Sequence, residues 1–182
     1  RAMQPVHVVL TAEDDQVKIY GINETAEPVK GNLDCGVFEL TGAYPVRQTA
    51  KVTLAPNAST VIASFPMSQW PNHQSSMAFA VLEQKGKILS RNRLFMPFFK
   101  EMKWPVPQID VRLKKGKAIF SSPTFAWAVC VDLNGDQPLA DNFFDIYPGQ
   151  EYQIPWPGKR APQILFVGNL APEMEGHTFP RG

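Results

Sequence analysis

The sequence predicts an all-β fold made of two tandem immunoglobulin-like β-sandwiches, joined by a short linker rich in proline and aromatic residues. Short runs that alternate between apolar and polar residues recur along the chain at intervals of about 8 to 14 residues, the pattern typical of a sandwich. Proline accounts for 17 of the 182 residues. Because proline breaks helix interiors and central strands but suits turns and edge strands, long helices are not expected.

Seven alternating runs predict the strands of a first module. They are Val6–Leu10, Gln16–Asn23, Gly36–Leu40, Arg47–Leu54, Ser59–Phe65, Met77–Glu83 and Ile88–Phe95. The Lys-Gly-Lys sequence at residues 85–87, between the last two runs, fits a hairpin turn. Residues 1–99 are therefore predicted to form a β-sandwich of the immunoglobulin-like or carbohydrate-binding-like kind.

A second series of runs predicts a C-terminal immunoglobulin-like sandwich over residues 104–182. The runs are Ile109–Leu113, Ala118–Ser121, Ala126–Leu133, Tyr152–Pro155 and Gln163–Val167. Apolar residues occupy both faces of Ala126–Leu133, which favours a central strand. Residues 171–182 lack alternation, which indicates a surface strap or a frayed end.

The joint between the modules is predicted within Pro97–Pro107, which reads PFFKEMKWPVP. Its three prolines restrict the backbone, so we expect the joint to be stiff. Phe98, Phe99 and Trp104 would be unusual in a linker without packing partners. We expect these three residues to form an apolar seam that holds the modules at a fixed angle.

Composition argues against several classes of partner. The formal net charge is +1 and the basic residues are scattered, whereas nucleic-acid binders show a basic stripe. No apolar run reaches the roughly 18 residues of a membrane helix. Cys35 and Cys130 fall in different predicted modules, each within an apolar stretch. We expect two buried free thiols rather than a disulfide.

The sequence shows no convergent set of catalytic or metal-binding residues. Asp141 and Asp145 are the most suggestive carboxyl pair, but an extended segment would separate them by about 13 Å. Cleavage of a glycosidic bond uses carboxyl groups about 5 to 9.5 Å apart. The segment Asp132–Asp136 starts like a calcium loop but lacks the later glycine and glutamate, and the three histidines lie far apart. No catalytic residue, metal or cofactor is expected.

Two tryptophans are candidates for carbohydrate contact, because sugars stack on exposed aromatic faces beside hydrogen-bonding groups. Trp70 lies in a predicted loop with polar neighbours, and Trp156 lies between two prolines. The alternative is that each indole packs against or caps the edge of a sandwich. Trp104 and Trp127 are better explained by the seam and the core.

From Asn92 onward the chain resembles the C-terminal end of β-mannosidases and related exo-acting enzymes of glycoside hydrolase family 2. One stretch that carries the resemblance is Asn92–Glu101, NRLFMPFFKE, which is similar to the elements that close the penultimate module. The other is Asp141–Glu151, DNFFDIYPGQE, which is similar to a motif of the final immunoglobulin-like domain. The resemblance covers roughly 90 residues well, and the N-terminal half only by its strand pattern.

The resemblance implies a parent enzyme whose catalytic (β/α)8 barrel and N-terminal domains precede these two modules and are their partners. It also implies a parent that works outside the cytoplasm, either periplasmic or secreted. Because the catalytic glutamates of such enzymes lie in the barrel, no catalytic role carries over to a residue here. Asp141, Asn142, Phe143 and Phe144 are interpreted as structural: the polar pair bonds the backbone at a turn and a phenylalanine anchors the next strand.

Three functions remain open at this point. The first is a non-catalytic accessory region that has a structural and docking role beside the barrel. The second is an autonomous carbohydrate-binding module, with an oligosaccharide as its ligand. The third is a cell-surface array of immunoglobulin-like domains with no enzyme attached.

Overall fold

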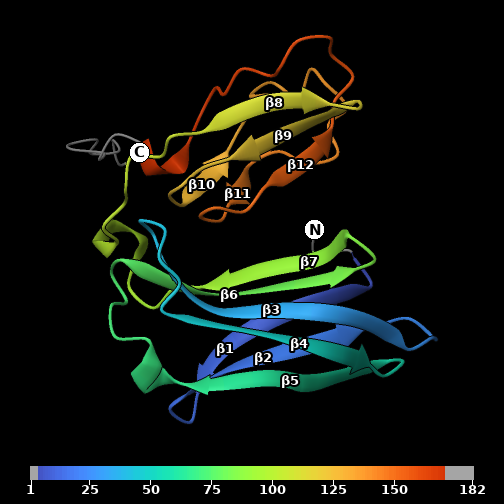
Figure 1. Ribbon diagram of the computed structural model, residues 1–182, viewed down its shortest axis with the longest axis vertical. Coiled ribbons are helices and arrows are strands. Elements are labelled where there is room, and N and C mark those ends of the chain that lie inside the picture. Colours follow the sequence, from blue (N-terminus) through green and yellow to red (C-terminus); the bar gives the residue numbers. More distant parts are fainter. Residues whose placement is uncertain (1–3, 171–182) are drawn as a thin grey trace, which may run out of the picture. The chain divides into compact units, whose positions relative to one another are not determined.

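The structure is a computed structural model that describes residues 4–170 (Figure 1). Apart from the short 3-10 turns η1 (Met67–Gln69), η2 (Phe99–Glu101) and η3 (Gly168–Leu170), each regular element of the described residues is a strand. The all-β prediction is confirmed. The chain divides into two compact units, residues 1–103 and 104–182, called here the first and second unit.

The first unit is a sandwich of two antiparallel sheets (Figure 1). The three-stranded sheet has the order β1-β2-β5, formed by β1 (Val6–Glu13), β2 (Gln16–Asn23) and β5 (Ala58–Pro66). The four-stranded sheet has the order β4-β3-β6-β7, formed by β3 (Val29–Glu39), β4 (Val46–Leu54), β6 (Ser76–Gln84) and β7 (Lys87–Leu94).

The core of the first unit lies between its two sheets. Strand β2 buries every second residue, including Val17 and Ile19. Leu33 on β3 and Leu82 on β6 face them from the other sheet and belong to the same buried cluster. The period-two alternation therefore identifies the side chains that are buried on folding. Burial of these apolar side chains is the main favourable contribution to the folding of a sandwich.

Strand β3 starts at Val29, seven residues before the predicted start at Gly36. The alternation is not visible in the sequence at Lys30, Gly31 and Asn32. Strand β4 nevertheless pairs with this whole segment, from Val29 opposite Leu54 to Val37 opposite Val46. Gly36 has a φ of 150°, and a Cβ at this position would lie 2.1 Å from the carbonyl oxygen of Val46. The close approach of β4 at this point requires glycine.

The second unit has shorter strands. One sheet has the order β12-β9-β8, formed by β8 (Asp110–Lys114), β9 (Lys117–Ser121) and β12 (Tyr152–Pro155). The other pairs β10 (Ala126–Val129) with β11 (Phe144–Ile146). Phe120, Val129, Phe144 and Ile154 are among the residues of its buried cluster.

Two strands predicted in the second unit are longer than the structure shows. The predicted strand Ala126–Leu133 ends at Val129, after a register shift between Ala126 and Val129; Ala128, in this interval, has a φ of 50°. The predicted strand Gln163–Val167 is reduced to a single bridge between Cys130 and Phe166. Beyond this bridge, side chains begin to satisfy the backbone: the N–H of Val131 donates to Asn142 Oδ1.

Of the three aromatic residues of the predicted joint, Phe99 and Trp104 contact other rings of their own units, whereas the side chain of Phe98 is 74% exposed. Phe99 contacts Phe95 with ring centroids 6.4 Å apart, and the N–H of Phe98 donates to Glu101 Oε2. Trp104 stacks on Phe125 and Trp127 of the second unit, at 6.2 and 6.0 Å. The seam and the fixed angle between the modules stay predictions. The tail, residues 171–182, lies outside the described residues.

Candidate functional site

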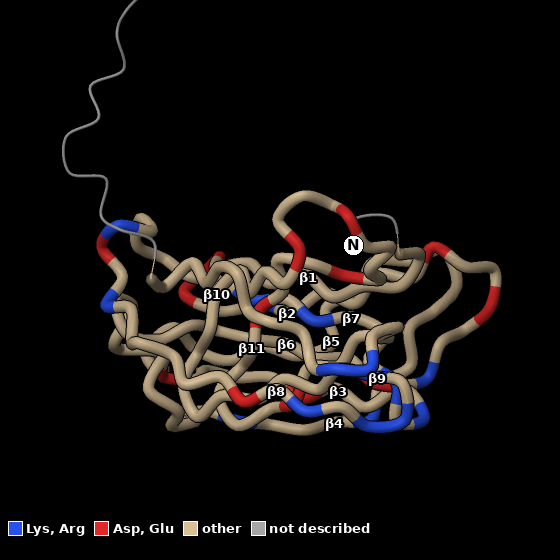
Figure 2. The backbone as a smooth tube through the Cα atoms, turned by 90° about the horizontal axis from the view of Figure 1, so that it is seen from above, with Lys and Arg blue, Asp and Glu red and all other residues tan. Residues whose placement is uncertain are grey.

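Carboxyl groups were the first candidates for chemistry, and their contacts are structural. Asp141 accepts a hydrogen bond from the hydroxyl of Tyr152, and Asp145 Oδ1 accepts the N–H of Ala128 at 3.1 Å. Within residues 4–170, no group of three His, Cys, Asp or Glu side chains could hold a metal ion, and no helix is long and apolar enough to cross a membrane. Both signs of charge occur along the backbone of each unit (Figure 2).

The segment Asp141–Phe144 joins two parts of the second unit. The Asn142 side chain accepts the N–H of Val131 at 3.0 Å and donates to the carbonyl of Asp132 at 2.6 Å. Its partners are thus about ten residues away, not in the local turn that the sequence suggested. Phe144 is buried and stacks on Tyr152 with ring centroids 4.4 Å apart, so it is the residue that anchors β11.

Asp132 organises the turn at Asn134-Gly135. Its carboxylate accepts the backbone N–H groups of Gly135 at 3.1 Å, Asp136 at 3.2 Å and Gln137 at 2.8 Å. These bonds, led by the one from Gln137, lower the pKa of Asp132 because they favour the charged carboxylate. Both carboxylate oxygens are therefore engaged with the backbone of the loop itself.

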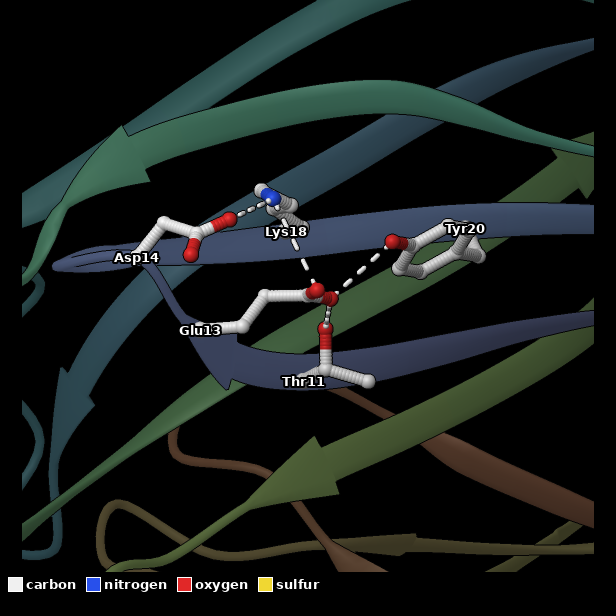
Figure 3. Close-up of polar contacts among 5 residues, drawn as sticks. All are labelled: Thr11, Glu13, Asp14, Lys18 and Tyr20. Atoms are coloured by element: carbon white, nitrogen blue, oxygen red, sulfur yellow. Dashed lines mark hydrogen bonds and ion pairs between the residues drawn. The ribbon is translucent and has the colours of Figure 1, made fainter.

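A polar cluster lies on strands β1 and β2 and the turn between them (Figure 3). Thr11 and Tyr20 each donate their hydroxyl to Glu13 Oε1, at 2.6 and 2.9 Å. Lys18 Nζ donates to Asp14 Oδ2 at 2.7 Å and lies 3.6 Å from Glu13 Oε2. The antiparallel register places Thr11 opposite Lys18 and so assembles the cluster.

The contacts in this cluster favour charged carboxylates. The pKa of Glu13 is lowered by its bonds from Thr11 and Tyr20, and the pKa of Asp14 is lowered by its bond from Lys18. A glycosidase general acid needs the opposite, a carboxyl group whose pKa is raised so that it holds a proton at neutral pH. The cluster suits surface stabilisation rather than acid catalysis.

Trp70 is a core residue, which corrects its candidacy as a sugar contact. The indole is 0% exposed and belongs to the buried cluster of the first unit. Its Nε1 donates to Ser76 Oγ at 2.8 Å, and Ser76 in turn donates to the carbonyl of Asn72. Because both the ring and its polar atom are satisfied inside, no face remains for stacking, and the packing alternative holds.

Trp156 lies in the second unit, where its ring contacts both the core and a surface hollow. Most of the ring is in the core, since only 9% of the residue is exposed, and Nε1 donates to the carbonyl of Arg160 at 2.8 Å. The residue also lines a shallow hollow of about 510 Å³. The other lining residues are Val131, Gln137, Gly158, Lys159, Arg160, Ala161, Pro162, Gln163 and Leu165.

A second hollow, of about 430 Å³, lies in the first unit where β3, β4 and the end of β6 meet. It is lined by Lys30, Gly31, Asn32, Lys51, Val52, Thr53, Glu83, Gln84 and Lys85. At Gly31 the strands β3 and β6 approach closely, since a Cβ there would lie 2.8 Å from the carbonyl oxygen of Glu83. This hollow mixes basic residues with the carboxylate of Glu83.

Comparison with known proteins finds one matching family model and several solved structures with a similar fold. Residues 15–101 match the model of the family described as Mannosidase Ig/CBM-like domain. The fold is similar to a β-D-mannosidase from Dictyoglomus thermophilum, with a TM-score of 0.75 and 18% identity over 87% of this chain and 20% of that chain. A search of curated proteins found no match.

An exo-chitosanase from Amycolatopsis orientalis has a similar fold, with a TM-score of 0.52 and 16% identity over 84% of this chain and 23% of that chain. This chain therefore spans between a fifth and a quarter of the length of the two solved enzymes. At these identities the similarity shows the fold alone.

Proposed function

We propose that this chain is an accessory region of a glycoside hydrolase of the β-mannosidase type, because residues 15–101 match the family model described as Mannosidase Ig/CBM-like domain. The chain stabilises and docks onto the catalytic barrel and the N-terminal domains of that enzyme and supplies no catalytic residue. An extracytoplasmic location of the parent enzyme is part of this proposal.

The observation that carries the proposal is that a single enzyme fold matches both units together. The similarity to the β-D-mannosidase covers 87% of this chain, which is more than the first unit alone could supply. Tandem modules whose folds both align with parts of one larger enzyme are expected to serve such an enzyme. The lowered pKa values of Glu13, Asp14 and Asp132 support a role other than acid catalysis.

Phe143 supports a docking role for the second unit. Its φ is 56°, a backbone conformation that is strained for a bulky residue, and 53% of the side chain is exposed. Its ring contacts Phe166, and Leu133, which follows the backbone held by Asn142, is 57% exposed. An exposed aromatic ring kept at a strained position is expected to have a use outside the isolated unit.

The proposal is tested with the parent enzyme, full length and truncated before Arg1, and with the chain alone. Hydrolysis of p-nitrophenyl β-mannoside and β-glucosaminide is measured together with the melting temperature. We expect no turnover by the isolated chain, and a truncated enzyme that melts at least about 5 °C lower. Turnover by the chain alone, or a truncated enzyme as stable and active as the whole, would contradict the proposal.

The docking patch is tested by Phe143→Asn, because asparagine tolerates a positive φ far better than phenylalanine. The isolated chain should become slightly more stable, since the strain is relieved. The parent enzyme should become less stable, since the contact is lost. Leu113→Asn, which changes another exposed apolar residue of the second unit, is the matched control and should leave the parent unchanged. Equal behaviour of the two variants in the parent would argue against docking through Phe143.

A further inference from the structure

The hollow at Trp156 combines an apolar floor with a basic rim. Val131, the edge of Trp156 and Leu165 supply the apolar part. Lys159 and Arg160 supply two adjacent positive charges, and Gln137 and Gln163 supply amides. Among the described residues that line it, none is acidic. The composition therefore favours a polar ligand that carries negative charge.

The loop on one side of the hollow is fixed by the indole. Trp156 Nε1 donates to the carbonyl of Arg160 at 2.8 Å, so the backbone that carries both cations is tied to a core residue. A Cβ at Gly158 would lie 2.6 Å from the same Nε1. The loop thus lies directly on the edge of the ring, and glycine at residue 158 permits this approach.

The loop on the other side is fixed by Asp132. Its carboxylate accepts three backbone N–H groups, including that of Gln137 at 2.8 Å. The negative charge of Asp132 is thus engaged in its own loop while the Gln137 side chain lines the hollow. Two walls held by hydrogen bonds lower the entropic cost of binding, because little ordering is left for the ligand to cause.

We propose that this hollow binds an acidic saccharide. The carboxylate of the sugar meets the guanidinium of Arg160 and the ammonium of Lys159, as charge-assisted hydrogen bonds require. The C–H face of the sugar ring lies over Val131, Trp156 and Leu165, while its hydroxyls bond the amides of Gln137 and Gln163. This inference does not depend on the accessory role in a hydrolase, since it concerns a site within the second unit alone.

Calorimetric titration of the full chain with two matched sugars tests the proposal. The probes are β-1,4-linked mannuronate oligosaccharides and β-1,4-linked mannan oligosaccharides of equal length, which carry at C5 of each sugar a carboxylate and a hydroxymethyl group, respectively. We expect the mannuronate to bind with a Kd of about 1 mM or tighter and the mannan at least roughly tenfold more weakly. Raising the salt to about 1 M should weaken mannuronate binding.

Variants separate this site from general attraction between charges. Lys159→Gln with Arg160→Gln should weaken mannuronate binding roughly tenfold or more and leave the weak mannan binding unchanged. The matched control is Lys30→Gln with Lys85→Gln, which removes two charges from the hollow of the first unit and should leave binding unchanged. Equal affinity for both sugars, equal weakening by both variant pairs, or no binding by the wild-type chain would each overturn the proposal.

Discussion

The two units differ in the groups that hydrogen-bond to their backbone N–H and C=O groups. In the first unit, β3 pairs with β4 and β6 along nearly its whole length, so strand ladders use most backbone groups. In the second unit, single side chains take over where strands stop. Asn169, for example, accepts the N–H of Trp127 and donates to the carbonyls of Pro105 and Phe125.

This difference determines where stability is vulnerable. In a strand ladder the hydrogen bonds are distributed over many residues, so the loss of one side chain has little effect. A change that distorts the backbone of a strand disturbs the pairing itself. A side-chain bridge concentrates several bonds in one residue, so a single deletion leaves several buried groups without a partner. We therefore expect Gly36 to be a sensitive position of the ladder in the first unit, and Asn169 to be a sensitive position of the second unit. The first unit also has a side-chain bridge, since the buried Asn23 donates to the carbonyls of Glu27, Leu54 and Ala55.

The largest expected effect is that of Gly36→Ala on the first unit. The new Cβ would meet the backbone of Val46 at 2.1 Å, which side-chain adjustment cannot relieve. We expect a loss of about 3 kcal/mol or more in the free energy of unfolding. Hydrogen exchange, resolved by peptide, should show faster exchange in the first unit.

Gly86→Ala is the matched control, since its φ is also positive, at 77°, but nothing lies within 4 Å of the new Cβ. It should cost about 1 kcal/mol, the price of the backbone conformation alone. If both glycine variants cost the same, the close approach of β4 to Gly36 is not what the ladder depends on.

The next effect is that of Asn169→Ala on the second unit. Removing this side chain leaves the N–H of Trp127 and two carbonyls without their partner. A loss of about 2 to 3 kcal/mol is expected, measured by urea unfolding. Asn92→Ala, which removes the bond to the Val8 carbonyl across strands of the first unit, should cost only about 1 kcal/mol. A ranking in the opposite order would refute the distinction between bridges and ladders.

Acid should weaken the second unit through Asp132. Its pKa is lowered in the folded state by bonds from backbone N–H groups, so the charged carboxylate stabilises the fold at pH values above the unfolded pKa, about 3.9. That stabilisation is lost as the pH falls through the lower, folded pKa. Asp132→Asn should flatten this dependence in melting curves recorded from pH 6 to pH 2. If the melting temperature of Asp132→Asn falls at low pH as much as that of the wild type, groups other than Asp132 cause the acid sensitivity.

The smallest effect is expected from the polar cluster on β1 and β2. Glu13 and Lys18 are solvated, and exposed ion pairs contribute little to stability. The double variant Glu13→Gln, Lys18→Gln should change the melting temperature by less than about 2 °C. A larger shift would show that this cluster supports the three-stranded sheet.

The same difference explains how far the sequence could predict the structure. Strands β2 and β12 have the predicted bounds, because alternation is visible wherever one face of a strand is buried and the other is not. The segment from Cys130 to Asn142 and the chain around Asn169 could not be predicted, since they depend on Asn142, Asn169 and Asp132 reaching partners that are distant or specific to one loop. The alternation of apolar and polar residues does not reveal such side-chain hydrogen bonds.

The candidate sites were predictable only in part. Trp156 was named as a candidate for sugar contact, which stays a prediction. The hollow beside it depends on the loop that its Nε1 holds, and this contact has no sequence pattern. Trp70 has polar neighbours in sequence and suggested exposure, whereas Ser76 pairs with its Nε1 inside the fold. The polar cluster of Glu13 and Lys18 required the strand register, which places residues seven positions apart in sequence directly across from each other.

Each unit also contains one free thiol, Cys35 in the first and Cys130 in the second, and both are buried. Burial raises the pKa of Cys35 to about 12, so the thiolate that reacts with alkylating reagents is scarce while the fold is closed. Alkylation of either cysteine therefore records an opening of the unit that contains it. Mass spectrometry of a single native sample, pulsed with iodoacetamide, would rank the two opening rates without any engineered label.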